Sequence, residues 1–490
     1  MEKLEGQFDN ATYTENNAKM YATTGDNLLD FFAQAGATRH WSESEILNLW
    51  RRAFSCQPQE AIKLLFYFRD VRGGQGERRI FRIILHDLAK NNTPGVANLI
   101  PLIPEYGRWD DLYCTIDTPV EPITWSIVGR QLTEDLHNYT QNQPISLLAK
   151  WLKSERTHGK TNALGLRTRK ALRLTSKEYR KTLSIFRKHI DVVERNMSLG
   201  NWKAIDLEKV PSQAMMKYRN CFKTKVPHFE DYMEKVNCGA AKINAKTLYP
   251  HQIVGQYLPG YCFGWGIKTN PVLEAQWKAL PNYINPEDSA LVIADVSGSM
   301  MGYGVNAPIN VSVGLAMYIS ERMKGQFANK FLTFSNRPEL VKIKGGSVAQ
   351  KIEGIVSSNW EINTDMAAVF RLILDTALDN NLPQSEIPKR IIVVSDMQFD
   401  QGATSRHFKK EMEELYTSHG YQLPLVIWWN VDSHSTFPMT QNEHGLMVSG
   451  MSPEIMQSVL SSEIITPMEL LQSVLNRDRY AALDEILKKS

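Results

Sequence analysis

The sequence predicts a multidomain chain in which an all-α helical array is followed by a doubly wound α/β domain. At 490 residues the chain is longer than one hydrophobic core usually supports. Apolar residues recur at helical spacing through most of the first 285 residues, whereas short apolar runs alternate with amphipathic stretches after them. The segment PNYINPED (281–288) has the composition of a linker, so we expect domains at 1–285 and 286–490.

The first half is predicted to consist of paired helices. LLDFFAQAG (28–36) is the first helical segment, and Ser42 has the chemistry of an N-cap for the helix that follows it. The stretches 58–70 and 77–90 predict a helical hairpin around a glycine-rich turn. Further pairs continue without a strict period, which indicates degenerate HEAT-like repeats or an irregular helical array.

The second half is predicted to form a mostly parallel sheet. Four short apolar runs have the length and composition of buried strands: ALVIAD (290–295), KFLTF (330–334), RIIVVSD (390–396) and PLVIWWNV (424–431). Longer amphipathic stretches such as NVSVGLAMYISERMKG separate these strands. This alternation is typical of a doubly wound, Rossmann-like α/β domain.

Hard oxygen ligands gather after two of these strands. Asp295, Ser297 and Ser299 in DVSGSM follow the first strand, and Asp396 ends RIIVVSD. Thr364 in NTDMAAVF adds a hydroxyl at another helix start. In open α/β sheets ligands bind beyond the carboxyl ends of strands, and such oxygens suit Mg²⁺, with Mn²⁺ or Ca²⁺ as alternatives. DVSGSM alone could instead be a strand-to-helix turn with a serine cap.

This pattern resembles the metal-ion-dependent adhesion site (MIDAS) of von Willebrand A domains. In that family the D-x-S-x-S side chains and the threonine hold the metal directly or nearly so, and the last aspartate often acts through water. The family often has Thr-Asp-Gly where this chain has Ser395, Asp396 and Met397. The aspartate ligand of the family is therefore present as Asp396, but the loop that follows it differs from the family pattern. Asp365 and Asp400 are interpreted as helix-start and loop acids rather than ligands.

Two N-terminal segments carry a second resemblance. LLFYFRDVRGGQGERRIFR and LIPEYGRWDDL resemble the helical (TROVE) module of the Ro autoantigen family, which precedes a von Willebrand A domain. LAKWL, KVPSQA and SDMQFD are more similar to an uncharacterised family with the same two-part plan. The Ro likeness implies a ring of helical repeats, closed by the von Willebrand A domain, that forms a ribonucleoprotein with structured or misfolded non-coding RNA.

The charge distribution supports an RNA surface in the helical half. Residues 1–285 hold 39 Lys and Arg against 29 Asp and Glu, whereas the remainder holds 17 against 24. Between Lys150 and Lys188 there are 13 basic residues and two acids, interleaved with aromatics, as RNA binding requires. The alternative is a solvated basic face paired with the acidic domain. The candidate RNA-binding residues are Lys150, Lys153, Arg167, Arg169, Lys170, Arg173, Lys177, Arg180, Lys181, Arg187 and Lys188.

Five arginines surround the glycines at 73, 74 and 76, and two interpretations of them stay open. Arg69, Arg72, Arg78, Arg79 and Arg82 could contact phosphates, or Asp70 and Glu77 could tie them into ion pairs. The turn is not a P-loop, because no G-K-[ST] follows it. Further along, we expect Asp110 or Asp111 to cap a helix start and Trp109 to pack between repeats.

We expect a non-enzymatic protein. Ser297 and Ser299 have no candidate base nearby, a G-x-S-x-G elbow is absent, and the histidines are dispersed. A metal-dependent phosphohydrolase would need more carboxylates than the motif supplies. The alternative to RNA binding is a protein-interaction scaffold, in which the metal site captures an acidic residue of a partner.

The remaining composition is that of a cytoplasmic protein. Its polar, acidic start lacks the features of a secretory leader, and no apolar run is long enough to span a bilayer. The cysteines, five in number and scattered without a C-x-x-C pair, are typical of reduced thiols. We therefore expect no membrane partner.

Overall fold

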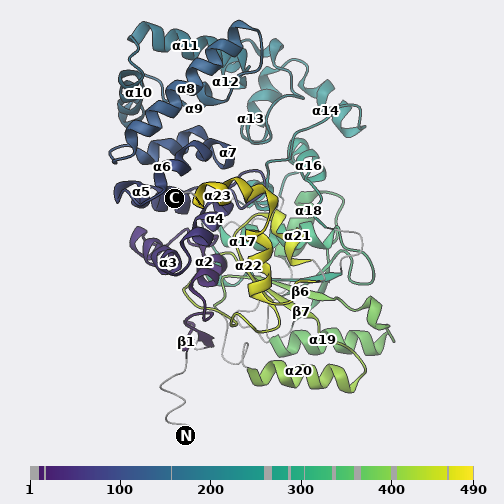
Figure 1. The fold of residues 1–490 in the computed structure, drawn as a ribbon. Coiled ribbons are helices and arrows are strands. Elements are labelled where there is room, and N and C mark those ends of the chain that lie inside the picture. Colours follow the sequence, from purple (N-terminus) through teal and green to yellow (C-terminus); the bar gives the residue numbers. More distant parts are fainter. Residues whose placement is uncertain are drawn as a thin grey trace. The chain divides into compact units, whose positions relative to one another are not determined.

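The computed structural model groups the chain into two compact units. We call Met1–Leu64, Gly73–Gln75 and Ile243–Arg477 the sheet unit, and Leu65–Arg72, Gly76–Lys242 and Asp478–Ser490 the helical unit. The N-terminal segment thus groups with the sheet, and the last helix groups with the helical array (Figure 1). The structure describes residues 10–15, 18–155, 157–258, 267–284, 289–302, 304–333, 338–357, 366–398, 406–460 and 463–488.

The sheet unit is built on a six-stranded sheet of order β5-β4-β3-β6-β7-β8. All neighbours are parallel except β4 and β5, which are antiparallel. Counted in chain order from β3, this is the 3-2-1-4-5-6 order of doubly wound folds, with the switch point between β3 and β6. The strands are β3 (Ala290–Ala294), β4 (Lys330–Thr333), β5 (Leu340–Lys342), β6 (Arg390–Ser395), β7 (Leu425–Asn430) and β8 (Leu446–Ser449).

Burial on both faces explains the uniformly apolar strands. Every residue of β3 and β6 is buried, as expected where helices cover both faces of a parallel sheet. Helix α17 (Pro308–Ser320) is buried along its whole length because it packs on β3, β4 and β6 and also against α15. At that crossing a Cβ on Gly314 would lie 2.8 Å from the backbone nitrogen of His251, so the close approach requires glycine.

The sheet unit also contains an N-terminal hairpin and further helices. The hairpin pairs β1 (Ala11–Tyr13) with β2 (Lys19–Tyr21), and α2 packs on β8. Ser42 caps α3 in a capping box with Glu45, as predicted. The helices are α2 (Asn27–Ala35), α3 (Glu43–Cys56), the start of α4 (Pro58–Arg69), α15 (Pro250–Tyr257), α16 (Pro271–Lys278), α18 (Val348–Val356), α19 (Met366–Asp379), α20 (Arg406–Ser418), α21 (Met456–Val459) and α22 (Pro467–Leu475), with 3-10 turns η4 (Gly298–Met300), η5 (Gln384–Glu386) and η6 (Pro453–Ile455).

The helical unit contains no strand among its described residues. Its helices place apolar residues inward at helical spacing; α11, for example, buries Tyr179, Leu183 and Phe186 and leaves its lysines outside. The elements are α5 (Arg79–Lys90), α6 (Val96–Leu99), α7 (Ile103–Tyr106), α8 (Glu121–Thr140), α9 (Leu148–Trp151), α10 (Gly159–Ala171), α11 (Ser176–His189), α12 (Val193–Ser198), α13 (Ser212–Lys225), α14 (Phe229–Asn237) and α23 (Ala481–Leu487), with η1 (Ile100–Leu102), η2 (Trp109–Thr115), η3 (Trp202–Ala204) and η7 (Asp478–Tyr480).

The predicted fold class is confirmed. A helical array is followed by a doubly wound, largely parallel sheet, and the four predicted strands are β3, β4, β6 and β7. The sequence did not reveal the short edge strands β5 and β8 or the N-terminal hairpin. In the described part of the chain, no helix is long and apolar enough to cross a membrane.

Candidate metal centre and nucleic-acid interface

Two of the predicted metal ligands lie at the switch point of the sheet. Asp295 follows β3 and Asp396 follows β6, and these strands are paired in parallel with Ala294 opposite Val394. The backbone N–H of Asp295 donates to the carbonyl oxygen of Val394, 3.1 Å away. Because both strands end at the same edge, the fold brings together two carboxylates that are 101 residues apart in the chain.

Asp295 is held rigidly. Its carboxylate accepts a hydrogen bond from the Ser395 hydroxyl at 2.6 Å and another from the backbone N–H of Ser297 at 2.9 Å. Only 2% of Asp295 is exposed. Burial, together with the neighbouring charge of Asp396, raises the pKa of Asp295 to about 7. Ser395 therefore positions the first carboxylate, a role that sequence reasoning did not assign to it.

The two predicted serine ligands lie beside each other. The Ser297 and Ser299 hydroxyl oxygens are 3.1 Å apart, and Ser299 in η4 is exposed to solvent. Their alternation in DVSGSM brings both hydroxyls to one side of the turn, as expected for D-x-S-x-S. Thr364, the fifth predicted ligand, and the acids Asp365 and Asp400 lie outside the described residues.

Asp396 has one carboxylate oxygen that a cation could satisfy. One carboxylate oxygen accepts from the backbone N–H of Gln398 at 3.1 Å, whereas the other, Oδ2, is buried without a hydrogen-bond partner in the described part of the chain. The nearest basic group is Nε2 of His434 at 4.0 Å. A buried carboxylate oxygen is usually satisfied by hydrogen bonds or a metal. No cluster of three or more His, Cys, Asp or Glu side chains suited to a metal occurs among the described residues, so hydroxyl oxygens would have to complete such a site.

The N-terminal hairpin reaches the same edge of the sheet. The backbone N–H of Glu15 donates to the side-chain oxygen of Gln398 at 2.9 Å, two residues after Asp396. Tyr21 and Phe437, in the loop after β7, exchange backbone hydrogen bonds of 2.9 and 3.0 Å. The chain start is therefore built into the surroundings of the candidate metal centre. Sequence reasoning missed this contact, because its partners are about 400 residues apart.

The second candidate site is the basic segment of α9, α10 and α11 in the helical unit. Three of its guanidinium groups make contacts with other elements of the helical unit. Arg167 pairs with Glu121 and Asp117 at 2.6 and 2.7 Å, and Arg169 pairs with Glu155 at 2.9 Å. Arg187 donates to the carbonyl oxygens of Ala149 and Leu152 and to the Ser154 hydroxyl. These arginines hold the helices together in addition to any contact with RNA.

Other predicted basic residues form what we call the basic stripe. It consists of five exposed side chains, Lys170, Arg173, Lys177, Lys181 and Lys188. Of the two acids between Lys150 and Lys188, Glu155 is buried and Glu178 is exposed. Glu178 accepts hydrogen bonds from the backbone and hydroxyl of Thr175, where it completes the N-terminal capping box of α11. Against this single exposed carboxylate the stripe carries five exposed cations, so it presents net positive charge to solvent.

The remaining predicted residues lie beside aromatic rings or the helix backbone. The Lys150 ammonium lies 5.6 Å from the centre of the Trp151 ring, and that of Lys153 lies 5.4 Å from the Tyr113 ring. Arg180 donates to the carbonyl oxygen of Ser176 at 3.1 Å. The segment thus combines cations with aromatic surface.

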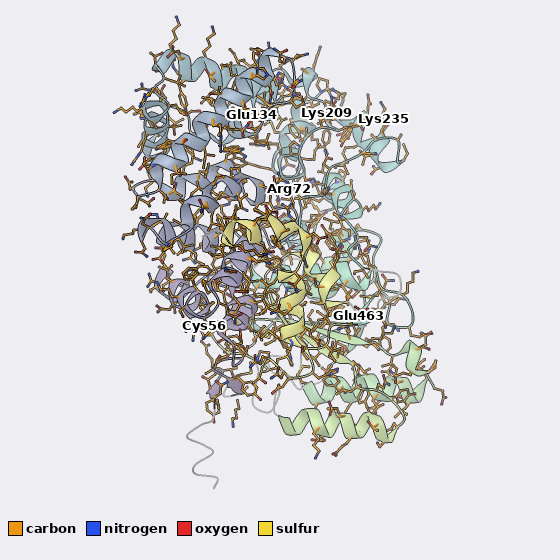
Figure 2. The ribbon with its side chains drawn as sticks, viewed as in Figure 1. Cys56, Arg72, Glu134, Lys209, Lys235 and Glu463 are labelled. Carbon is orange, nitrogen blue, oxygen red and sulfur yellow. The ribbon has the colours of Figure 1, made fainter. Side chains whose placement is uncertain are left out.

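Arg69, Arg72 and Arg82 near the glycine turn form ion pairs, with acids other than those expected. Asp111 is fully buried and pairs with both Arg69 and Arg82 at 2.7 Å, while Asp70 pairs with Arg479. Asp111 also accepts from the backbone N–H of Arg108, which confirms its predicted capping role. Arg72, labelled in Figure 2, is 55% exposed.

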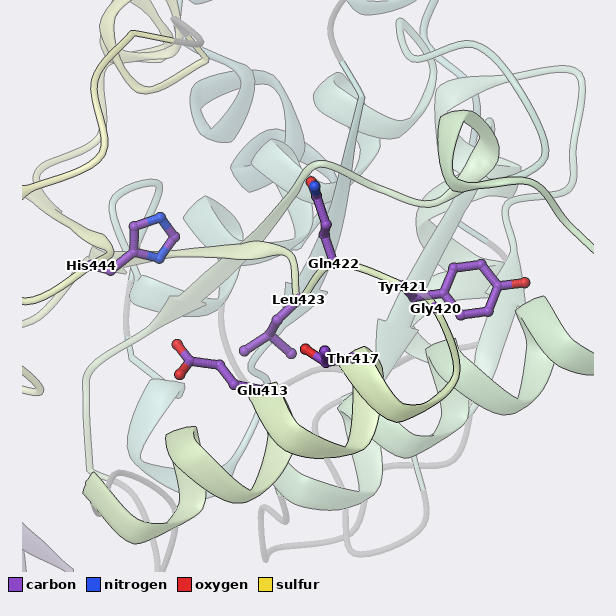
Figure 3. Close-up of a pocket in the computed structure, with 7 residues that line it drawn as sticks. All are labelled: Glu413, Thr417, Gly420, Tyr421, Gln422, Leu423 and His444. Carbon is purple, nitrogen blue, oxygen red and sulfur yellow. The ribbon is translucent and has the colours of Figure 1, made fainter.

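A separate hollow of about 430 Å³ lies in the sheet unit near the end of α20. Figure 3 shows Glu413, Thr417 and His444 among the side chains around it. None of the predicted metal or RNA residues lines it. It therefore contributes nothing to either candidate site.

Comparison with known proteins supports the expected relationship. One family model, "Domain of unknown function (DUF2828)", matches residues 14–104 and 145–288, and a second, "Domain of unknown function (DUF7788)", matches residues 289–485. An uncharacterised protein of Acanthamoeba polyphaga mimivirus is 28% identical over 511 aligned positions, which cover 95% of this chain and 87% of that protein. The predicted likeness to an uncharacterised two-part family is thereby confirmed.

A solved structure also aligns with the chain. The crystal structure of the Ro (RSR) protein of Deinococcus radiodurans covers 90% of this chain and 100% of its own, with a TM-score of 0.43 and 13% sequence identity.

Proposed function

We propose that the protein is a non-enzymatic RNA-binding protein that holds structured or misfolded non-coding RNA on its helical unit. The observation that carries the proposal is the basic stripe: five exposed cations in and just before α11, against one exposed acid, Glu178. Lysine and arginine side chains neutralise phosphates and release counterions, and this drives most of the affinity for nucleic acid.

The kind of RNA follows from the geometry of the stripe. Lys177, Lys181 and Lys188 project from one helix at four- and seven-residue intervals, so they repeat along its axis. Flexible ammonium groups on a helix surface contact phosphates without selecting bases. Such a surface suits folded RNA, which proteins recognise mainly by shape and backbone.

The metal centre is the second part of the proposal. Asp295, Ser297, Ser299, Thr364 and Asp396 would hold one Mg²⁺, or Mn²⁺ or Ca²⁺ in its place. The bound cation would supply an open coordination position able to take a carboxylate oxygen. Two features of the structure favour this use: Ser299 is exposed, and Asp396 keeps an unpartnered buried oxygen among the described residues.

A second candidate function rests on this centre alone. The protein would then be an interaction scaffold whose metal captures an aspartate or glutamate of a partner protein. This function needs no RNA and no basic stripe. The two candidates therefore differ in which substitutions matter.

The test is recovery of RNA with the purified protein. The wild type, a stripe variant (K177E/K181E/K188E) and a control variant (K324E/K344E/K389E) are purified at moderate salt, and the bound nucleic acid is sequenced. The control reverses the same charge at exposed lysines of the sheet unit. We expect defined, structured RNAs with the wild type and the control but not with the stripe variant. RNA recovered equally with all three, or with none, would contradict the proposal.

A further inference from the structure

The helical unit contains a groove that the proposed function does not use. It has a volume of about 780 Å³ and lies among α9, α11 and α12, which Figure 1 shows close together within this unit. Its lining combines an indole ring, several cations, the carboxylates of Glu155 and Glu194, and apolar side chains. That combination is the inventory needed for an aromatic base joined to a phosphate.

Trp151 supplies the aromatic surface. It is half-buried, and the guanidinium carbon of Arg108 lies 4.3 Å from the centre of its ring. A cation on an aromatic face fixes the plane of the ring. Leu199, at the rim of the groove, is 64% exposed, so the groove has apolar surface against which a flat base can pack.

The cations of the groove fall into a fixed group and an available group. Arg187 is fixed by its three hydrogen bonds to Ala149, Leu152 and Ser154. Lys150, Arg180 and Arg195 also line the groove, and none of them makes an ion pair with a carboxylate of the described residues. They are therefore available to a phosphate.

Glu155 adds a hydrogen-bond acceptor. It lines the groove, is 7% exposed, and gives one carboxylate oxygen to Arg169 at 2.9 Å. Its other oxygen, Oε1, has no partner among the described residues. A buried carboxylate oxygen gains from an N–H donor, and the exocyclic amino groups of adenine, cytosine and guanine are such donors.

We propose that this groove binds a nucleotide, with its base against Trp151, its amino group toward Glu155 and its phosphate on Arg180 and Arg195. The nucleotide is either an unpaired residue of the bound RNA or a free mononucleotide. For the first source the inference rests on the proposed RNA-binding function and deepens it, because it assigns the helical unit an unpaired, amino-bearing base in addition to folded RNA.

The test uses short probes that the basic stripe alone cannot hold tightly. Binding of AMP is measured by calorimetry, and binding of fluorescein-labelled rA5 and rU5 by anisotropy. We expect W151A to weaken the binding of rA5 by about tenfold, since one stacked base contributes on that scale. R180A/R195A should also weaken the binding of rA5, because it removes the proposed phosphate contacts. Glu155→Gln, which keeps the size of the side chain, should reduce the preference for rA5 over rU5, while K324E/K344E/K389E should bind as the wild type does. Tm measurements identify any variant that fails to fold, and W151F should recover part of the binding.

The outcomes separate the two sources and the two proposals. Binding of AMP supports a mononucleotide site, whereas binding of rA5 alone supports an unpaired RNA segment. If neither AMP nor rA5 binds at millimolar concentration, or if folded W151A, R180A/R195A and E155Q variants all bind rA5 as the wild type does, the groove proposal is overturned. If these variants no longer bind rA5, while structured RNA is still recovered with the stripe variant, the groove proposal is supported and the proposed function is contradicted.

Discussion

Asp396→Asn should make the protein less stable than the wild type in Mg²⁺ but not in its absence. In metal-free protein, Asp396 keeps a buried carboxylate oxygen without a partner among the described residues, beside buried Asp295. A buried, unsatisfied polar group lowers stability by about 1–3 kcal/mol. Asparagine removes the charge while keeping the shape, so the metal-free variant should equal the wild type or exceed its unfolding free energy by up to about that amount.

With Mg²⁺ the wild type should be more stable than Asp396→Asn. A ligand present at one hundred times its dissociation constant stabilises the folded state by about 2.7 kcal/mol, and the wild type should gain this while the variant, lacking one charged ligand, gains less. Urea denaturation in EDTA and in Mg²⁺ gives the four free energies needed. Glu411→Gln is the control, because that acid is 64% exposed. Equal stabilisation of Asp396→Asn and wild type by Mg²⁺ would refute the assignment.

Three further predictions concern buried groups outside the metal centre. Asp111→Asn should lower the unfolding free energy by about 3–5 kcal/mol, because it leaves the buried Arg69 guanidinium without its partner charge; in urea denaturation, a loss below about 1 kcal/mol would contradict this. Burial and nearby Arg39 lower the pKa of His251 in the folded protein to about 3. As the pH falls below about 6.5, His251 is therefore protonated in the unfolded chain but not in the folded protein, so the free energy of unfolding should decrease. Denaturation across this pH range should show a flatter profile for His251→Asn, and an unchanged slope would count against the assignment. Burial raises the pKa of Cys114 to about 12, so a thiol reagent at pH 8 should modify exposed Cys56 faster than Cys114. Equal rates of modification at Cys56 and Cys114 would contradict this assignment.

The sequence predicted the parts of the fold that depend on local pattern. β3 and β6 were recognisable because their residues are uniformly apolar, and α3 because Ser42 caps it. The carboxylates at the ends of these strands could be placed together, since neighbouring parallel strands end at one edge of a sheet.

The sequence could not supply contacts that depend on distant partners. Ser395 looked like the end of a strand, yet its hydroxyl holds Asp295, 100 residues away. The short strands β1, β5 and β8 carry too few residues to show a period. For the arginines near the glycine turn, adjacent acids were visible, whereas the actual partners such as Asp111 are brought in by tertiary packing.

The basic segment illustrates the same limit for function. Composition gave equal weight to the eleven candidate cations among the 13 basic residues between Lys150 and Lys188. The structure shows that Arg167, Arg169 and Arg187 bind neighbouring helices and segments, whereas the basic stripe is exposed. A count of charges cannot distinguish these groups, because the acids and carbonyl oxygens that hold the arginines come from other elements.

The salt dependence of binding to a hairpin RNA tests the central claim most directly. For each phosphate contact, the slope of log K against log salt concentration changes by about 0.7–0.9. We predict that K177Q/K181Q/K188Q lowers the magnitude of the slope by about 2–3 relative to the wild type, and that K324Q/K344Q/K389Q leaves it unchanged. An unchanged slope for the stripe variant, with the RNA still bound, would show that these lysines do not contact phosphates and would contradict the account.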